Sequence, residues 1–167
     1  MAAGGLASYT NLCDQIDKTG SYALNADEAT PYTCLFNTDP SSCVRSDADE
    51  QLLFQFTFQS PMKIFSLNFI GLDDDSAPCT VKLFVNRPGM TFDDVDGVEP
   101  TQTLKLTPED LREDGLTKLR FVRFQKVTQL TVFIEDNAGA EITQLVHLGI
   151  FGESIHRTNM DELKKSG

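Results

Sequence analysis

The chain has 167 residues, with 25 acidic and 14 basic side chains and a formal net charge of -11. This charge repels phosphate backbones and anionic lipid head groups, so nucleic-acid binding and membrane-surface binding are disfavoured. Hydrophobic residues make up 40% of the chain and include twelve Phe and no Trp, which predicts one globular domain whose aromatic packing rests on Phe.

Targeting signals and metal-type cysteine motifs are absent from the sequence. The N-terminus has no basic segment followed by an apolar one, and no apolar run reaches 18 residues. We therefore expect a protein of the cytosol or nucleus, in which Cys13, Cys34, Cys43 and Cys79 stay reduced. No CxxC occurs, and the spacings lack the pattern of a structural zinc site, although the pair Cys34 and Cys43 leaves a disulfide or a metal open.

The N-terminal part predicts a short helix followed by irregular chain. Apolar residues recur at helical spacing from Tyr9 to Ile16, and Gly20 gives a natural stop. Residues 21–46 are rich in Asn, Asp, Ser, Thr and Pro without a clean period, so we expect a long irregular segment lying across the domain.

The rest of the chain is predicted to be β structure. Residues 52–59 and 64–70 alternate apolar and polar side chains on either side of Ser60-Pro61, which predicts a long hairpin. Further strands are predicted at 80–86, 101–106, 119–125, 129–135 and 144–151, with about one helical turn after Thr107. Seven strands with polar turns and almost no helix predict an all-β fold, an antiparallel β-sandwich or jelly roll. We place one domain at 8–160, with flexible termini at 1–7 and 161–167.

Catalytic machinery is not visible in the sequence. The two histidines are His147, whose place in the apolar run LVHLGIF favours a structural role, and His156 in the exit segment. No GxSxG, HExxH or phosphate-binding Gly loop occurs. The sequence therefore predicts no enzyme and no cofactor.

Acidic loops are the candidate cation sites. The three groups are Asp47, Asp49 and Glu50; Asp73, Asp74 and Asp75; and Asp93, Asp94 and Asp96. None has the EF-hand pattern, and loop acids of an acidic protein are usually solvated, so no metal is predicted and a structural Ca²⁺ stays the lesser alternative. Sugar binding is less favoured, because it needs exposed aromatic side chains and most Phe residues fall at core-facing positions of the predicted strands. Protein interaction is therefore the favoured function.

Several phrases carry a family resemblance: SDADEQLL, EPTQTLKLTPEDLREDG, LRFVRFQKV, TVFIEDNAGAE and IFGESIHRTNM. From about Leu12 to Met160 the chain resembles the PITH domain, the proteasome-interacting thioredoxin domain. The resemblance implies a jelly-roll β-sandwich similar to galactose-binding-like domains, and association with the 26S proteasome. In the best-known members a thioredoxin domain precedes this one. Here no thioredoxin fold or redox CxxC is present, so redox activity is not carried over, and the chain is either a domain-only member or a C-terminal domain.

The resemblance also marks candidate partner-binding residues. They are Asp47, Asp49, Glu50, Glu99, Gln102, Asn137 and Glu141. A structural role stays open for each, because short polar side chains also satisfy loop backbone groups. Arg120 or Arg123 is expected to reach an acid of the Asp47 group, a pair that would hold loops.

We thus expect a non-enzymatic, monomeric interaction module that docks on the 26S proteasome regulatory particle. A small-ligand or carbohydrate-binding jelly roll is the first alternative. A thiol enzyme is the second, and buried or widely separated cysteines would exclude it.

Overall fold

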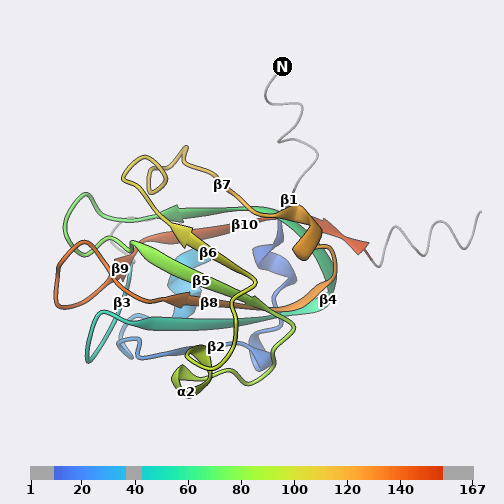
Figure 1. Cartoon of the computed structure of the whole chain (residues 1–167), viewed down its shortest axis with the longest axis horizontal. Helices are drawn as coiled ribbons and strands as arrows, with labels where there is room; N and C mark the ends of the chain where they lie inside the picture. Colours follow the sequence, from blue (N-terminus) through green and yellow to red (C-terminus); the bar gives the residue numbers. More distant parts are fainter. Residues whose placement is uncertain (1–9, 37–42, 156–167) are drawn as a thin grey trace, which may run out of the picture.

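The computed structural model describes residues 10–36 and 43–155, which form a curled antiparallel β structure with short helical turns on its surface (Figure 1). The strands are β1 (Thr10–Asn11), β2 (Tyr22–Leu24), β3 (Val44–Arg45), β4 (Leu52–Ile70), β5 (Thr80–Val85), β6 (Gln102–Lys105), β7 (Thr117–Lys118), β8 (Val127–Ile134), β9 (Gln144–Leu145) and β10 (His147–Ser154). The helical segments are η1 (Leu12–Gln15), η2 (Lys18–Gly20), η3 (Tyr32–Phe36), α2 (Phe92–Val95) and η4 (Phe121–Arg123). Among the described residues, no helix has both the length and the apolar character needed to cross a membrane.

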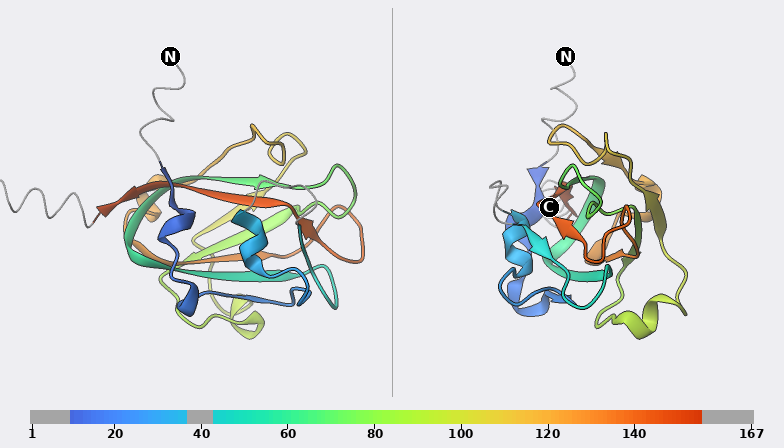
Figure 2. Two further views of the ribbon diagram at one scale, coloured as in Figure 1. Left: turned by 180° about the vertical axis from the view of Figure 1, so that it is seen from behind. Right: turned by 90° about the vertical axis from the view of Figure 1, so that its left-hand side faces the viewer.

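The predicted hairpin around Ser60-Pro61 is wrong, because β4 is one strand of 19 residues. Its N-terminal half pairs with β2 and β8, and its C-terminal half pairs with β7 and β10. Figure 2 (left) shows β4 passing around one end of the molecule from one layer to the other. Pro61 is tolerated there because the pairing with β8 shifts register between Thr57 and Met62.

Both faces of the first half of β4 are covered. Leu52, Phe54 and Phe56 enter the main core, as their alternation predicts. Leu53, on the opposite face, enters a smaller cluster with Phe133 that α2 and its flanking loop cover. The fold is therefore a sandwich in which the loops add a second layer of packing over one sheet.

A second correction concerns the predicted strand at 119–125. The structure has the two-residue strand β7 before this segment and the 3₁₀ turn η4 within it. Phe121 and Phe124 are three residues apart, a spacing that suits a 3₁₀ turn and breaks the strand period. Phe124 is fully buried, whereas Phe121 is partly exposed.

The other elements follow the sequence with shifted ends. The strands predicted at 80–86, 101–106 and 129–135 are confirmed as β5, β6 and β8, and the last one divides into β9 and β10. In place of the single predicted N-terminal helix the chain forms two 3₁₀ turns, η1 and η2, which the extended residues Ile16 and Asp17 separate; η2 ends at Gly20. The segment after Thr107 is a hydrogen-bonded turn closed by Asp110. The predicted termini and His156 lie outside the described residues.

Candidate functional site

Three acidic loops meet at one end of the sandwich, on the left in Figure 1. They connect β3 to β4 (46–51), β4 to β5 (71–79) and β8 to β9 (135–143). We call eight of their carboxylates the acidic end: Asp47, Asp49, Glu50, Asp73, Asp74, Asp75, Asp136 and Glu141. The ninth, Glu135, forms an ion pair with Lys82 and is not included. All eight are exposed except Glu50, which is half-buried, so this end presents a strongly negative surface.

Hydrogen bonds between the loops fix this surface. Thr143 N donates to Ser46 Oγ at 2.8 Å, and Thr143 Oγ1 donates to the Glu50 carbonyl at 2.6 Å. Ala140 N donates to the Asp75 carbonyl at 3.2 Å, which ties the second loop to the third. The acidic end is thus a preformed surface built from three distant parts of the sequence.

Asp49 has a structural role as well as an exposed position. Its Oδ1 accepts from Gln51 N at 3.0 Å and from Asn25 Nδ2 at 2.9 Å. The structural role that the sequence left open for these acids is therefore observed for Asp49. Asp47 donates its backbone N–H to Asn25 O, and its carboxylate has no partner among the described residues.

Asn137 shapes the β8–β9 loop, and Glu141 projects from it. Asn137 Nδ2 donates to Ile142 O at 3.0 Å and to Thr143 Oγ1 at 3.1 Å, while its Oδ1 accepts from Gly139 N at 2.9 Å. Glu141 is exposed. Of these two predicted residues, Glu141 is the one whose side chain is available to a partner.

The remaining predicted residues lie elsewhere. Gln102 pairs with Leu83 on β5, whereas the acidic end reaches β5 at Thr80, about 10 Å away along the strand. Gln102 Oε1 accepts from Arg120 N at 2.8 Å, and Glu99 is exposed just before this strand. The seven predicted residues therefore do not form one site.

The expected ion pair between Arg120 or Arg123 and the Asp47 group is not formed. Arg123 Nη1 donates instead to the Thr101 carbonyl at 3.2 Å, so it holds the β6 entry. Within 10–36 and 43–155, the ion pairs are Arg45–Asp27 at 3.6 Å and Lys82–Glu135 at 2.9 Å.

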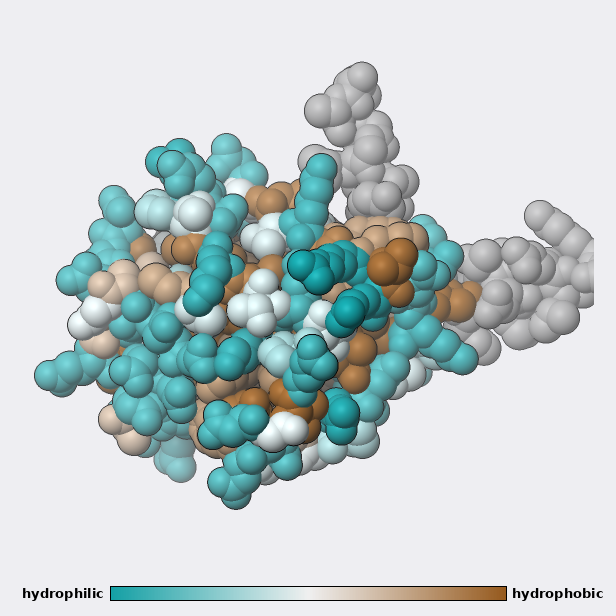
Figure 3. All heavy atoms as spheres, in the orientation of Figure 1, coloured by the Kyte–Doolittle hydropathy of each residue, from teal (hydrophilic) through white to brown (hydrophobic). Residues whose placement is uncertain are grey.

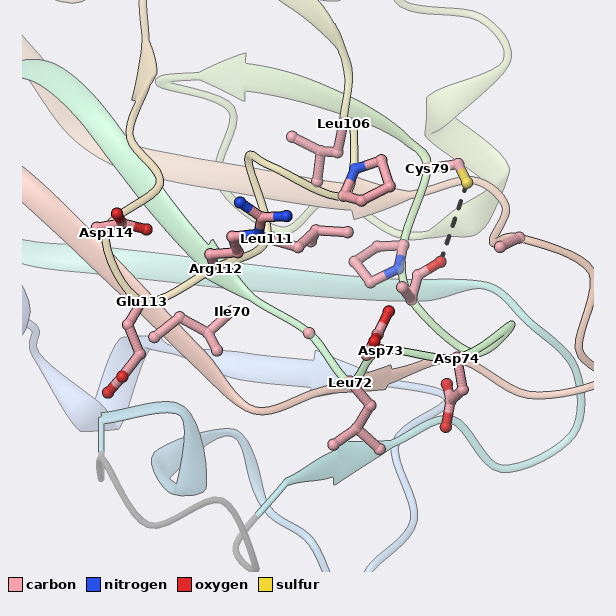
Figure 4. A pocket seen from close by; sticks show the side chains of 15 residues that line it. Ile70, Leu72, Asp73, Asp74, Cys79, Leu106, Leu111, Arg112, Glu113 and Asp114 are labelled. Carbon is pink, nitrogen blue, oxygen red and sulfur yellow. Dashed lines mark hydrogen bonds between the residues drawn. The ribbon is translucent and has the colours of Figure 1, made fainter.

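A groove of about 840 Å³ opens beside the acidic end, between the β4–β5 loop and the β6–β7 loop (106–116) (Figure 4). Its apolar floor includes Leu72, Leu106 and Leu111. Asp73, Asp74, Glu113 and Asp114 also line it, together with Arg112, the single cation among its lining residues. No aromatic side chain is among its lining residues. The groove therefore suits a ligand that combines positive charge with an apolar group.

Sequence reasoning missed the groove although both of its loops stand out as acidic. The phrases GLDDDSAP and PEDLREDG belong to loops that a hydrogen bond joins, from Gly71 N to the Leu111 carbonyl at 3.1 Å. The acidic character of each loop was the available signal. Their adjacency depends on long-range pairing that local patterns do not contain.

Two ionisable groups beside the groove have shifted pKa values. Hydrogen bonds from the Ser76 side chain and then its backbone hold the pKa of Asp74 below its ordinary value. Partial burial, and next the charge of Asp136, raise the pKa of Cys79. A thiol with a raised pKa is a poor nucleophile, which argues against thiol chemistry in the groove.

The other cysteines and the described histidine fit structural roles. All four cysteines are free thiols, and burial raises the pKa of Cys13 to about 12. His147 is buried at the start of β10, in register with Ile70 of β4. Among the described residues, no group of three or more His, Cys, Asp or Glu side chains could hold a metal ion.

Comparison with known proteins gives the chain clear relatives. The family model described as PITH domain matches residues 3–167. Thioredoxin-like protein 1 of Schizosaccharomyces pombe is 34% identical over 147 residues, which cover 85% of this chain and 51% of that protein. Human PITH domain-containing protein 1 is 40% identical over 116 residues, which cover 70% of this chain and 54% of that protein. The chain thus spans about half the length of the curated relatives it matches.

Solved structures share the fold at very low sequence identity. A family 32 carbohydrate-binding module of Clostridium perfringens in complex with galactose superposes with a TM-score of 0.63 at 7% identity, covering 86% of this chain and 98% of that one. A fucolectin from striped bass serum superposes with a TM-score of 0.57 at 10% identity, covering 86% of this chain and 47% of that one. These neighbours confirm the predicted galactose-binding-like jelly roll, and at such identity they inform on the fold alone.

Proposed function

The chain belongs to the PITH domain family, and from this premise we propose that it is a non-enzymatic protein-interaction module that associates with the regulatory particle of the 26S proteasome. Its docking surface is the acidic end together with the adjoining groove. The partner segment is basic and carries an apolar side chain. The family resemblance supports the choice of partner, and the geometry of the acidic end supports the mode of binding.

The observation that carries this proposal is the preformed acidic end. Its loops are joined by backbone and side-chain hydrogen bonds before any partner arrives, so little conformational entropy is lost on docking. Exposed carboxylates attract a basic partner from a distance and raise the association rate. The apolar floor at Leu106 and Leu111 then offers area to bury once the charges have oriented the partner.

A carbohydrate-binding module is the second candidate function. One observation favours it: a groove lies beside the loops of a fold that is also found in a module solved with galactose. The groove has no aromatic lining residue on which a sugar ring could stack, which favours the protein partner. Binding of the chain to defined sugars on a glycan array would favour the carbohydrate-binding function over the protein-interaction function.

The test is recovery of proteasome subunits from cell extract on the immobilised chain. Asp47→Lys/Glu141→Lys removes two exposed carboxylates of the acidic end, and Asp14→Lys/Asp96→Lys makes the same charge change on exposed carboxylates outside it. We expect the first variant to lower recovery about fivefold or more and the second to leave it near the wild-type level.

Equal losses in the two variants would assign the effect to net charge and reject the acidic end. No recovery with the wild-type chain, at low as well as moderate salt, would reject the proteasome as partner. Circular dichroism of each variant confirms that the fold is intact.

A further inference from the structure

We propose that the turn η4 is a second docking surface, which binds an acidic protein segment bearing a bulky apolar side chain. The surface, here called the η4 patch, consists of Lys118, Arg120, Phe121, Val122, Arg123 and Lys126. It is separate from the acidic end and has the opposite charge. The proposal therefore stands or falls independently of the proteasome assignment.

The first observation is the exposure of apolar side chains. Among the described residues, the exposed large hydrophobic side chains are Phe121 at 38% and Val122 at 77%. They are adjacent in sequence, and the other large apolar side chains of the described residues are buried or partly buried. Figure 3 shows hydrophobic surface beside strongly hydrophilic groups where η4 lies in Figure 1. Such a patch is typical of an interaction site.

The second observation is the local charge. Residues 116–134 contain no Asp or Glu, while four cations lie within 118–126, in a chain of net charge -11. All four are exposed. In the described part of the chain, neither Lys118, Arg120 nor Lys126 forms an ion pair with an acid. The positive charge of the η4 patch is thus available to a partner.

The third observation is that the patch is held rigidly. Phe121 stacks on Phe65 of β4 with ring centroids 4.7 Å apart and an interplanar angle of 19°. Ile64 N donates to the Phe124 carbonyl at 2.9 Å, and Phe124 is fully buried. Gln102 receives the Arg120 N–H, as described above. The turn therefore presents its side chains without having to be ordered by a partner.

Charge and side-chain chemistry together select the partner. An acidic protein segment places a few carboxylates against the four cations, while its apolar side chain covers Val122 and the exposed edge of Phe121. A long polyanion such as nucleic acid is disfavoured, because it would extend past the four cations and come close to the acidic remainder of the domain, which repels it. Phe65 already occupies one ring face of Phe121, and the aliphatic Val122 cannot stack on a base.

The test is fluorescence anisotropy with a labelled twelve-residue peptide of Asp, Glu and Ser that contains one central Phe. The protein variants are Arg120→Glu, Val122→Ser and the charge-matched control Lys18→Glu, each at an exposed side chain. The expected result is that Arg120→Glu weakens binding about tenfold and Val122→Ser about threefold. Lys18→Glu leaves binding unchanged, and Asp47→Lys/Glu141→Lys retains it.

Several results would overturn the proposal. Equal weakening by Lys18→Glu would mean that net charge alone decides binding. If the peptide with Ser in place of Phe binds with the same affinity as the Phe peptide, the apolar contact does not contribute to binding. Tighter binding of a twelve-nucleotide oligothymidylate would assign the patch to nucleic acid, and concentration-dependent dimerisation lost in Val122→Ser would assign it to a second copy.

One result supports the independence of the two surfaces. If Asp47→Lys/Glu141→Lys loses proteasome recovery but retains peptide binding, the η4 patch is a separate docking surface from the acidic end.

Discussion

Asn25 Nδ2 donates to Asp49 Oδ1 at 2.9 Å and so ties the β2–β3 segment to the loop that begins the acidic end. Asn25 also donates to the Gln51 carbonyl at 2.6 Å and accepts from Ala48 N at 3.0 Å. Its backbone φ of 64° lies in the left-handed region, which Asn tolerates better than most residues. One side chain thus holds the entry to β4 in place.

The first prediction separates these two roles of Asn25. Asn25→Gly removes the side-chain hydrogen bonds and keeps the backbone conformation, so the free energy of unfolding should fall by about 2 kcal/mol. Asn25→Ala adds the strain of a positive φ and should cost about 1 kcal/mol more. Urea denaturation measures both. Equal losses of unfolding free energy in the two variants would show that the positive φ adds no strain for Ala. Values near that of the wild type in both variants would show that the side-chain hydrogen bonds of Asn25 do not contribute to stability.

The second prediction concerns Gly152, where the backbone of β4 leaves no room for a side chain on β10. The register shifts between Phe151 and Gly152, and a Cβ at Gly152 would collide with the Lys63 carbonyl oxygen. Gly152→Ala should therefore lower the free energy of unfolding by about 3 kcal/mol or more, because backbone atoms must move. Gly97→Ala is the matched control, since a Cβ there meets no atom within 4 Å. A similar small loss in both variants would contradict the close approach.

The relation between sequence and fold is clearest at β4. Alternation located both of its halves and the core-facing Phe54, Phe56, Phe58 and Phe69, because a half-buried strand enforces a period of two. Phe65, which has the same phase of alternation as Phe69, is instead half-buried and stacks on Phe121. Ser60-Pro61 carries the chemistry of a turn, yet the chain bends there without reversing. Whether such a site bends or reverses depends on the partners β8 and β10, which no local window contains.

The same limit applies to the candidate site. The entry role of Asp49 was predictable, because a short acid before a strand commonly binds nearby amides. That Glu99 and Gln102 lie apart from the acidic end was not, because their position follows from the register of β6 on β5. The pattern LRFVRFQ predicted that Phe121 and Val122 belong to a strand. Their exposure could not be predicted, because it arises from the turn η4, which forms in place of that strand.

The third prediction is a pH dependence from Asp74. Its folded-state pKa lies below the ordinary 3.8, chiefly because the Ser76 hydroxyl and then the Ser76 N–H donate to the carboxylate. The stabilisation is therefore present above pH 3.8 and is lost as the pH falls through the folded-state value. The stability difference between wild type and Asp74→Asn should shrink as urea unfolding is repeated from pH 6 down to about pH 3. Asp75→Asn is the control, and a difference that stays constant with pH would reject the linkage.

The fourth prediction concerns the reactivity of Cys13. Burial raises the pKa of its thiol to about 12, and its Sγ donates to the Leu148 carbonyl at 3.5 Å. At pH 8 the thiolate, which is the reactive form, then makes up roughly one part in ten thousand of Cys13. Iodoacetamide should therefore leave Cys13 unmodified in the native protein and modify it fully in urea, as peptide mass spectrometry can measure.

Cys13→Ser gives a complementary measurement, because it replaces the partly buried thiol with a hydroxyl and should lower the free energy of unfolding by about 1 kcal/mol. Rapid native-state alkylation of Cys13 would show that η1 opens from β10 far more often than its packing implies. In that case the thiol would be accessible through local unfolding, and its raised pKa would not protect it.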